Sequence, residues 1–154
     1  MKEEKYQLLT EQIKALTAGE NDVVSVMANV CAAIHEAMGF FWTGFYIVKE
    51  GELRLGPFQG PVACMHIGFG RGVCGTAWQQ CQTQVVPDVE QFPGHIACSS
   101  LSRSEIVVPI VTADGTVKAV LDIDSKELAT FDNTDVTYLE QICAIVAPLF
   151  ENEP

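Results

Sequence analysis

Apolar residues recur at spacings of three and four near both ends of the chain, whereas tight turns separate two pairs of strand-like runs in the middle. The spacing of three and four is typical of helices with one buried face. The pattern predicts helices over residues 2–17, from a cap at Asn21 to Gly39, and from a cap at Asp132 to Phe150. The stripes that define them are Tyr6, Leu9, Ile13 and Leu16; Val23, Met27, Val30, Ile34 and Met38; and Val136, Leu139, Cys143, Val146 and Phe150.

Two strand pairs lie between these helices. Residues 40–48 are expected to pair with 53–58, and residues 105–112 with 116–124, each pair across a short turn that contains glycine. Strands joined in this way are adjacent and antiparallel, and helices with apolar stripes must cover a face of the sheet that they form. We therefore expect an α+β fold, in which an antiparallel sheet is flanked by N- and C-terminal helices.

Residues 60–103 are irregular, because glycine and proline recur there. A short helix is expected over 72–80 and a brief strand at Val85-Val86. A chain of 154 residues buries about two thirds of its unfolded surface in one core, without the help of disulfides or metals. No repeat or linker divides the sequence, so we expect a single domain over residues 1–154.

The charge balance excludes some partners. The chain has 20 Asp and Glu against 9 Lys and Arg, a formal net charge of -11. Binding to nucleic acid or to an anionic membrane takes its affinity from basic residues, so neither is an expected partner. The first five residues are charged, and no apolar run is long enough to act as a signal core or to span a bilayer. The expected compartment is the cytosol.

In that compartment the six cysteines are expected to be thiols rather than structural disulfides. Cys31 and Cys143 fall on or beside helical stripes and are expected in the core. The other four, Cys64, Cys74, Cys81 and Cys98, lie in the irregular segment, where functional residues concentrate.

No metal is expected. The four cysteines of the irregular segment lack the close pairs of a structural zinc site, although a site assembled from three of them with two histidines stays an alternative. Cys31 and His35 are four apart on a helix, but two ligands alone are weak support for a metal.

A glycine loop over residues 70–75 matches G-x-G-x-x-G, with Glu90 about twenty residues further on, as in dinucleotide-binding folds. The match is interpreted as accidental, because Pro87 and Pro93 interrupt the following segment and the neighbouring strands pair as hairpins. The loop instead suits a small anion, such as a carboxylate, at the start of the helix that holds Cys74. The same helix terminus is expected to favour the thiolate of Cys74.

Asp122 and Asp124 are two apart in an otherwise apolar strand, so both project from the same face. Glu105 opens the neighbouring strand and is expected to face the same cavity. Three clustered carboxylates repel one another, so at least one keeps its proton near neutrality, and the others attract a cation such as an ammonium group. For Asp124 an exposed strand end is the alternative, and for the nearby aromatic Trp42 the alternative to a cavity wall is core packing.

Taken together, these segments resemble the free methionine-(R)-sulfoxide reductases, a family of stand-alone GAF-domain enzymes. The resemblance runs from about Phe40 to Leu139. It rests on Trp42-Thr43-Gly44-Phe45-Tyr46, Leu55-Gly56-Pro57-Phe58-Gln59-Gly60, Gly70-Arg71-Gly72-Val73-Cys74-Gly75-Thr76-Ala77, Gly94-His95-Ile96-Ala97-Cys98, Ser104-Glu105-Ile106-Val107-Val108-Pro109 and Val120-Leu121-Asp122-Ile123-Asp124-Ser125.

The resemblance implies a GAF domain with a six-stranded antiparallel sheet, a homodimer, and free methionine-(R)-sulfoxide as substrate. Thioredoxin is the implied reductant, and no cofactor is implied. Cys98 is the implied nucleophile, which becomes a sulfenic acid, and Cys64 and Cys74 are the implied partners in resolving disulfides. The remaining implied site residues are Glu105, Asp122 and Asp124 as acids that contact the substrate, Trp42 as the wall around its methyl-sulfur end, and Asp88 as a supporting or ammonium contact.

The alternative function is a non-catalytic GAF sensor of a small ligand or of redox state. A sensor passes its signal to an output domain, and the expected helices begin near Met1 and end near Pro154, which leaves no room for one in this chain. A pure thiol sensor also leaves the acids in the strand unexplained. We therefore expect an enzyme.

Overall fold

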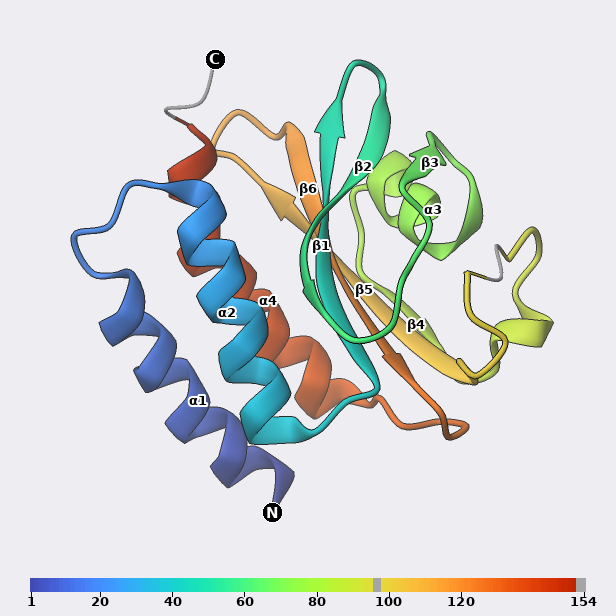
Figure 1. Cartoon of the computed structure of the whole chain (residues 1–154), viewed down its shortest axis with the longest axis horizontal. Helices are drawn as coiled ribbons and strands as arrows, with labels where there is room; N and C mark the ends of the chain where they lie inside the picture. Colours follow the sequence, from blue (N-terminus) through green and yellow to red (C-terminus); the bar gives the residue numbers. More distant parts are fainter. Residues whose placement is uncertain (96–97, 152–154) are drawn as a thin grey trace.

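The computed structural model describes residues 1–95 and 98–151. In this part of the chain one sheet has six strands in the order β3-β2-β1-β6-β5-β4, with each neighbouring pair antiparallel. Helices α2 and α4 cover one face of the sheet, with α1 packed against both of them, and α3 lies on the other face (Figure 1). The expected α+β fold is confirmed. The elements are α1 (Lys2–Thr17), α2 (Val23–Met38), β1 (Trp42–Lys49), β2 (Glu52–Gln59), β3 (His66–Gly68), α3 (Gly72–Gln80), β4 (Gln84–Val86), η1 (Val89–Gln91), β5 (Ser104–Val111), β6 (Val117–Ser125) and α4 (Asn133–Phe150).

The expected element bounds are nearly those observed. Helix α2 ends at Gly39, whose φ of 68° is left-handed and whose N–H donates to the His35 carbonyl. Its cap is Asp22 rather than the expected Asn21. Strand β1 begins at Trp42, two residues later than expected. Strand β3 was not expected, because three residues with a single buried side chain carry no readable alternation.

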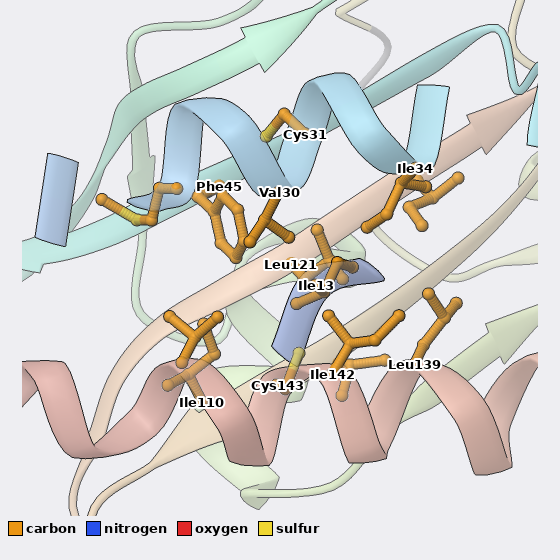
Figure 2. Close-up of a cluster of buried hydrophobic side chains, with 14 of the residues drawn as sticks. Ile13, Val30, Cys31, Ile34, Phe45, Ile110, Leu121, Leu139, Ile142 and Cys143 are labelled. Carbon is orange, nitrogen blue, oxygen red and sulfur yellow. The ribbon is translucent and has the colours of Figure 1, made fainter. Parts of the chain in front are cut away.

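Each face of the sheet contributes side chains to its own hydrophobic cluster. Alternate strand residues such as Phe45, Ile106 and Leu121 belong to the cluster formed with α1, α2 and α4. Figure 2 shows Phe45 and Leu121 in this cluster. Their neighbours in sequence, such as Tyr46 and Val107, face the opposite side and pack toward α3. Because side chains alternate along a strand, a single register fixes both the main core and the second face. The second face carries Trp42, Glu105, Asp122 and Asp124.

The glycine loop serves a tight turn and not a dinucleotide site. Among the described strands none pairs in parallel, which a Rossmann unit requires. A Cβ on Gly75 would lie 2.5 Å from the Gly68 carbonyl oxygen, so only glycine allows the start of α3 to pack this closely. The Gly70 N–H closes the loop by donating to the Gly75 carbonyl at 3.1 Å.

A buried polar network joins the two ends of the chain. Asp135 is fully buried near the start of α4, where its carboxylate accepts from the Tyr6 hydroxyl at 2.5 Å and from Lys2 Nζ at 2.7 Å. It also accepts from the Asp132 N–H at 2.8 Å, which completes a capping box. Helix α1 is thereby fastened to the expected cap of α4.

In the described part of the chain no helix combines the length and the apolar character needed to cross a membrane.

Candidate active site

A cavity lies on the second face of the sheet. Alternate residues of β1, β5 and β6 form its floor, and the β2–β3 loop, the start of α3 and the segment before β5 form its walls. The lining includes Trp42, Tyr46, Arg71, Cys74, His95, Cys98, Glu105, Asp122 and Asp124. Six of the eight expected site residues thus line one cavity. A seventh, Cys64, lies beside the cavity, because its neighbour Ala63 is part of the lining.

Strand register brings the floor residues together. Asp124 on β6 lies opposite Trp42 on β1 and opposite Glu105 on β5. Directly opposed residues in antiparallel strands project to the same face. Asp122 is two residues earlier on β6 and lies opposite Gly44. The expectation that the three acids share a cavity is therefore confirmed, and the alternative of an exposed strand end does not hold for Asp124, which is partly buried and lines the cavity.

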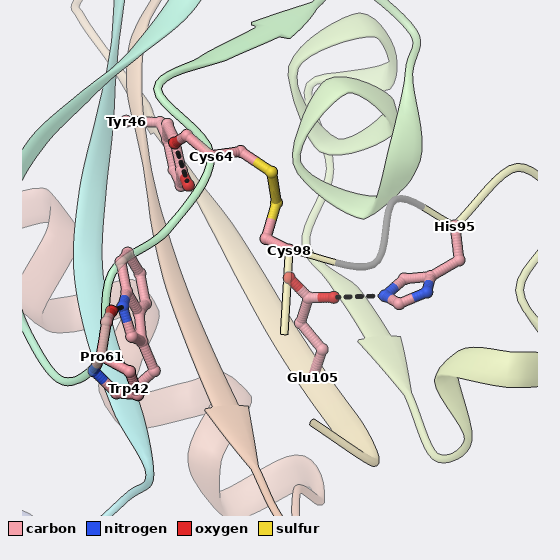
Figure 3. Close-up of a disulfide and its surroundings, with 7 residues drawn as sticks. All are labelled: Trp42, Tyr46, Pro61, Cys64, His95, Cys98 and Glu105. Atoms are coloured by element: carbon pink, nitrogen blue, oxygen red, sulfur yellow. Dashed lines mark hydrogen bonds and ion pairs between the residues drawn. A yellow bond between two sulfur atoms is a disulfide. The ribbon is translucent and has the colours of Figure 1, made fainter. Parts of the chain in front are cut away.

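The aromatic side chains of β1 are held in place by hydrogen bonds. The Trp42 indole N–H donates to the Pro61 carbonyl at 2.9 Å, and its ring stacks on Phe58 at 5.2 Å between centroids. The Tyr46 hydroxyl donates to the Cys64 carbonyl at 2.9 Å (Figure 3). Both bonds attach the β2–β3 loop to β1. Trp42 therefore serves as a cavity wall and packs against other aromatic rings at the same time.

A disulfide joins Cys64, on the β2–β3 loop, to Cys98, on the segment before β5, with 5.5 Å between the Cα atoms. Cys98 is exposed and lines the cavity, whereas Cys64 is half-buried. Figure 3 shows the bridge beside the Glu105 carboxyl group. Ile96 and Ala97, which belong to the motif around Cys98, lie outside the described residues.

The carboxyl groups hold protons more tightly than usual. Burial, followed by the charges of Asp122 and Asp124, raises the pKa of Glu105 well above its usual range. Burial raises the pKa of Asp122, and burial together with the Asp122 charge raises that of Asp124. The buried Oδ1 of Asp122 has no hydrogen-bond partner among the described residues. The cluster therefore provides both a neutral acid and an acceptor that lacks a donor.

Cys74 does not become the expected thiolate. Its thiol lies buried near the N-terminus of α3, and burial, followed by the charges of Asp122 and Glu105, raises its pKa well above the usual value. The favourable field at a helix N-terminus is worth about 1 kcal/mol, which is less than the cost of placing an anion beside buried carboxylates. The expectation was wrong because the sequence does not show that Cys74 faces the acids.

His95 does not supply a positive charge either. Its Nε2 lies 3.9 Å from Glu105 Oε1, and burial lowers its pKa below the usual value. The lowered pKa of His95 favours its neutral imidazole, and the raised pKa of Glu105 favours its protonated form, so neither group supplies a positive charge. The only permanently charged cation among the described lining residues is Arg71, just before α3.

The zinc alternative that used both Cys64 and Cys98 is not assembled, because these two sulfurs are bonded to each other. Another group of ligand atoms, from Cys74, Glu105 and Asp122, lies within 4.8 Å. A cation there would have to displace the protons that the raised pKa values retain.

Asp88 lies apart from the other expected site residues. It is not among the described residues that line the cavity, and its Oδ1 accepts from the Glu90 N–H at 3.0 Å at the start of η1. Arg71, Ser99 and Ser102 line the cavity but were not expected. Only Arg71 carried a signal, because it lies in the glycine loop that was expected to receive an anion.

Three cysteines lie outside the cavity, and the two that were expected in the core are found there. Cys31 and Cys143 are buried in the main core, and burial raises the pKa of Cys31 to about 12. Cys81 is an exposed free thiol at the left-handed end of α3.

Comparisons with known proteins agree with this geometry. A sequence model of the family described as GAF domain matches residues 20–151. GAF domain-containing protein A of Dictyostelium discoideum is 57% identical over 146 residues, or 94% of this chain and 92% of the relative. Free methionine-R-sulfoxide reductase of Escherichia coli is 44% identical over 144 residues, or 93% and 87% of the two chains. The solved structure of free methionine-R-sulfoxide reductase from Neisseria meningitidis in complex with its substrate has a TM-score of 0.91 at 53% identity, covering 95% of this chain and 88% of that one. The chain therefore belongs to the GAF-domain family and, within it, to the free methionine-R-sulfoxide reductases.

Proposed function

We propose that the chain reduces free methionine-R-sulfoxide to methionine, with Cys98 as the nucleophile and Cys64 as the resolving thiol. The observation that carries the proposal is the Cys64–Cys98 disulfide at the edge of a cavity floored by Glu105, Asp122 and Asp124. Such a bridge is the oxidised end state of a thiol-dependent reduction. The relatives that bear the reductase name support the same reaction.

The reaction balances in two steps. The Cys98 thiolate attacks the sulfoxide sulfur while an acid protonates the oxygen. The S–O bond of the sulfoxide then breaks, its oxygen passes to Sγ of Cys98, and methionine departs, which leaves Cys98 as a sulfenic acid. The Cys64 thiolate then attacks Sγ of Cys98, the S–O bond breaks, and the oxygen leaves as water after taking up a proton. One sulfoxide and two thiols give one thioether, one disulfide and one water molecule.

Glu105 is the proposed acid. It lies next to Cys98 (Figure 3), and its raised pKa keeps a proton available at neutral pH. The neutral charge of Glu105 also favours the nearby Cys98 thiolate more than a carboxylate would.

The remaining groups match the ends of a small zwitterion. The unpartnered Oδ1 of Asp122, together with Asp124, suits an ammonium group. Arg71 and the first N–H groups of α3 suit a carboxylate. The Trp42 ring suits the methyl-sulfur end. Asp88 is retained as a proposed ammonium or supporting contact, which Asp88→Asn tests through the KM for the sulfoxide.

Cys74 is not proposed as the thiol that resolves the Cys98 sulfenic acid. Because Cys64 already forms the bridge and the buried Cys74 thiol holds its proton tightly, Cys74 is proposed as a neutral neighbour of the acids that exchanges into a disulfide only secondarily.

The proposal includes thioredoxin as the reductant and a reducing, cytosolic compartment, which the four free thiols suit. The homodimer that the family resemblance implies stays a prediction, and light scattering on the purified protein tests it.

The decisive experiment replaces the nucleophile. Cys98→Ser is expected to abolish dithiothreitol-dependent reduction of free methionine-R-sulfoxide, whereas Cys81→Ser, at the exposed thiol outside the cavity, keeps full activity. N-acetylated or peptide-bound sulfoxide is expected to be refused, since it lacks the ammonium group. Full activity of Cys98→Ser overturns the proposal, and a wild-type protein that binds the sulfoxide without consuming it is instead a sensor.

A further inference from the structure

The two loops that carry the disulfide also carry large apolar side chains that face solvent. Val62 and Met65, on either side of Cys64, are 88% and 69% exposed, and Leu101, three residues after Cys98, is 55% exposed. We call these three residues the apolar collar. Single exposed apolar residues are common, but three within three residues of one redox-active bridge indicate a contact surface.

The two cysteines of the bridge differ in exposure. Cys98 is exposed, whereas Cys64 is half-buried and its backbone carbonyl is held by the Tyr46 hydroxyl. Thiol–disulfide exchange requires a thiolate to reach one sulfur in line with the S–S bond. Because Cys98 is the more exposed of the two residues, its Sγ is the sulfur to which we assign the attack.

From these observations we propose that the apolar collar is the docking surface for a dithiol protein of the thioredoxin type, whose thiolate attacks Sγ of Cys98. This inference rests on the proposed function, since only turnover creates a need to reduce the bridge. An apolar surface offers little to glutathione, a small anionic thiol, and a chain of net charge -11 repels it. A protein dithiol instead gains affinity by burying Val62, Met65 and Leu101.

The exchange balances. The partner's first thiolate bonds to Sγ of Cys98, the S–S bond breaks, and Cys64 takes the electron pair and then a proton. The partner's second thiol attacks the mixed disulfide, which forms the partner's own disulfide and releases Cys98. Two electrons and two protons pass from the partner to the two cysteines.

The first experiment traps the mixed disulfide. The oxidised wild-type protein is mixed with a recombinant thioredoxin that lacks its second cysteine, and the cross-linked peptide is identified by mass spectrometry. Attachment at Cys98 is expected, and attachment at Cys64 overturns the assigned direction of attack.

The second experiment tests the surface with Met65→Asp and Leu101→Asp, two collar positions that do not line the cavity. Each is expected to lower kcat/KM for thioredoxin by about tenfold, a typical factor for a residue central to an interface. Turnover with dithiothreitol is expected to stay at the wild-type level. Leu8→Asp, at an exposed position on α1, is the matched control and leaves both rates unchanged.

The outcomes separate the two proposals. If neither the wild-type protein nor the variants reduce free methionine-R-sulfoxide with dithiothreitol, the proposed function is wrong. If dithiothreitol supports turnover but Met65→Asp and Leu101→Asp react with thioredoxin as fast as the wild type, the docking surface is wrong. Glutathione that supports turnover as well as thioredoxin also overturns the assigned partner.

Discussion

Glu105 on β5 lies directly opposite Asp124 on β6, so the antiparallel register places two carboxyl groups side by side on the cavity floor. Two neighbouring carboxylates repel each other strongly in a partly buried site if both are ionised. At least one carboxyl group of the cluster is therefore expected to keep its proton. The proposed chemistry depends on this relationship, because the sulfoxide oxygen must receive a proton at neutral pH.

Glu105→Gln removes the proposed proton donor but keeps the size and the hydrogen-bonding capacity of the side chain. We expect kcat/KM for free methionine-R-sulfoxide to fall by about 100-fold or more, the usual loss on removal of a general acid. Glu127→Gln, at an exposed position, is the matched control. Steady-state kinetics with dithiothreitol provide the measurement, and a loss equal to that of the control would remove Glu105 from the role of acid.

The same substitution has a predicted effect on stability. A carboxyl group whose pKa is raised on folding, as that of Glu105 is, stabilises the fold below its ordinary pKa of about 4.3, and this contribution is lost as the pH rises through the folded pKa. Glutamine cannot ionise. Glu105→Gln is therefore expected to raise Tm at about pH 8 and to leave it nearly unchanged near the ordinary pKa of about 4.3. Thermal melts across this range supply the measurement, and equal Tm differences at both ends would contradict the buried, coupled acid.

Two tryptophans allow a spectroscopic test of the cavity wall. Trp42 lines the cavity, whereas Trp78 is on α3 and packs edge-on against Phe69. Binding of the sulfoxide to Cys98→Ser protein is expected to change the indole fluorescence. A Trp78→Phe background keeps this change and a Trp42→Phe background loses it. A fluorescence change that is lost in Trp78→Phe and kept in Trp42→Phe would contradict binding of the sulfoxide beside Trp42.

The network around Asp135 predicts a stability effect far from the cavity. Asp135→Ala leaves the buried end of Tyr6 without its acceptor and Lys2 without its partner, so we expect a loss of about 3 kcal/mol in the free energy of unfolding. Glu11→Ala breaks only the exposed pair with Lys14 and is expected to leave stability nearly unchanged. Urea titrations of the two variants give the comparison, and similar losses would contradict the structural role of Asp135.

Much of this architecture is readable from local patterns. The stripes of α1, α2 and α4 have a helical period, and the positions of Asp122 and Asp124 follow from strand alternation alone. Strand register then determines which residue of β5 meets them. Glu105 could be predicted as their neighbour because its strand is next along the chain and a hairpin joins the two.

The features that depend on irregular backbone could not be predicted in the same way. Cys64 and Cys98 are 34 residues apart in a segment without a repeating pattern, and the family resemblance left both Cys64 and Cys74 as partners for Cys98. The pKa of Cys74 depends on which groups surround it, and the helix terminus alone gave the wrong direction. Asp88 illustrates the same limit, because its cap on η1 places its carboxylate away from the described cavity lining.

The central claim is that one catalytic turnover oxidises Cys98 and Cys64 together. The most direct measurement is disulfide mapping by mass spectrometry after the fully reduced protein has reacted with a single equivalent of free methionine-R-sulfoxide. The account predicts one equivalent of methionine and a single new cross-linked peptide that joins Cys64 to Cys98. A cross-link between Cys74 and Cys98, or methionine formed without any disulfide, would contradict it.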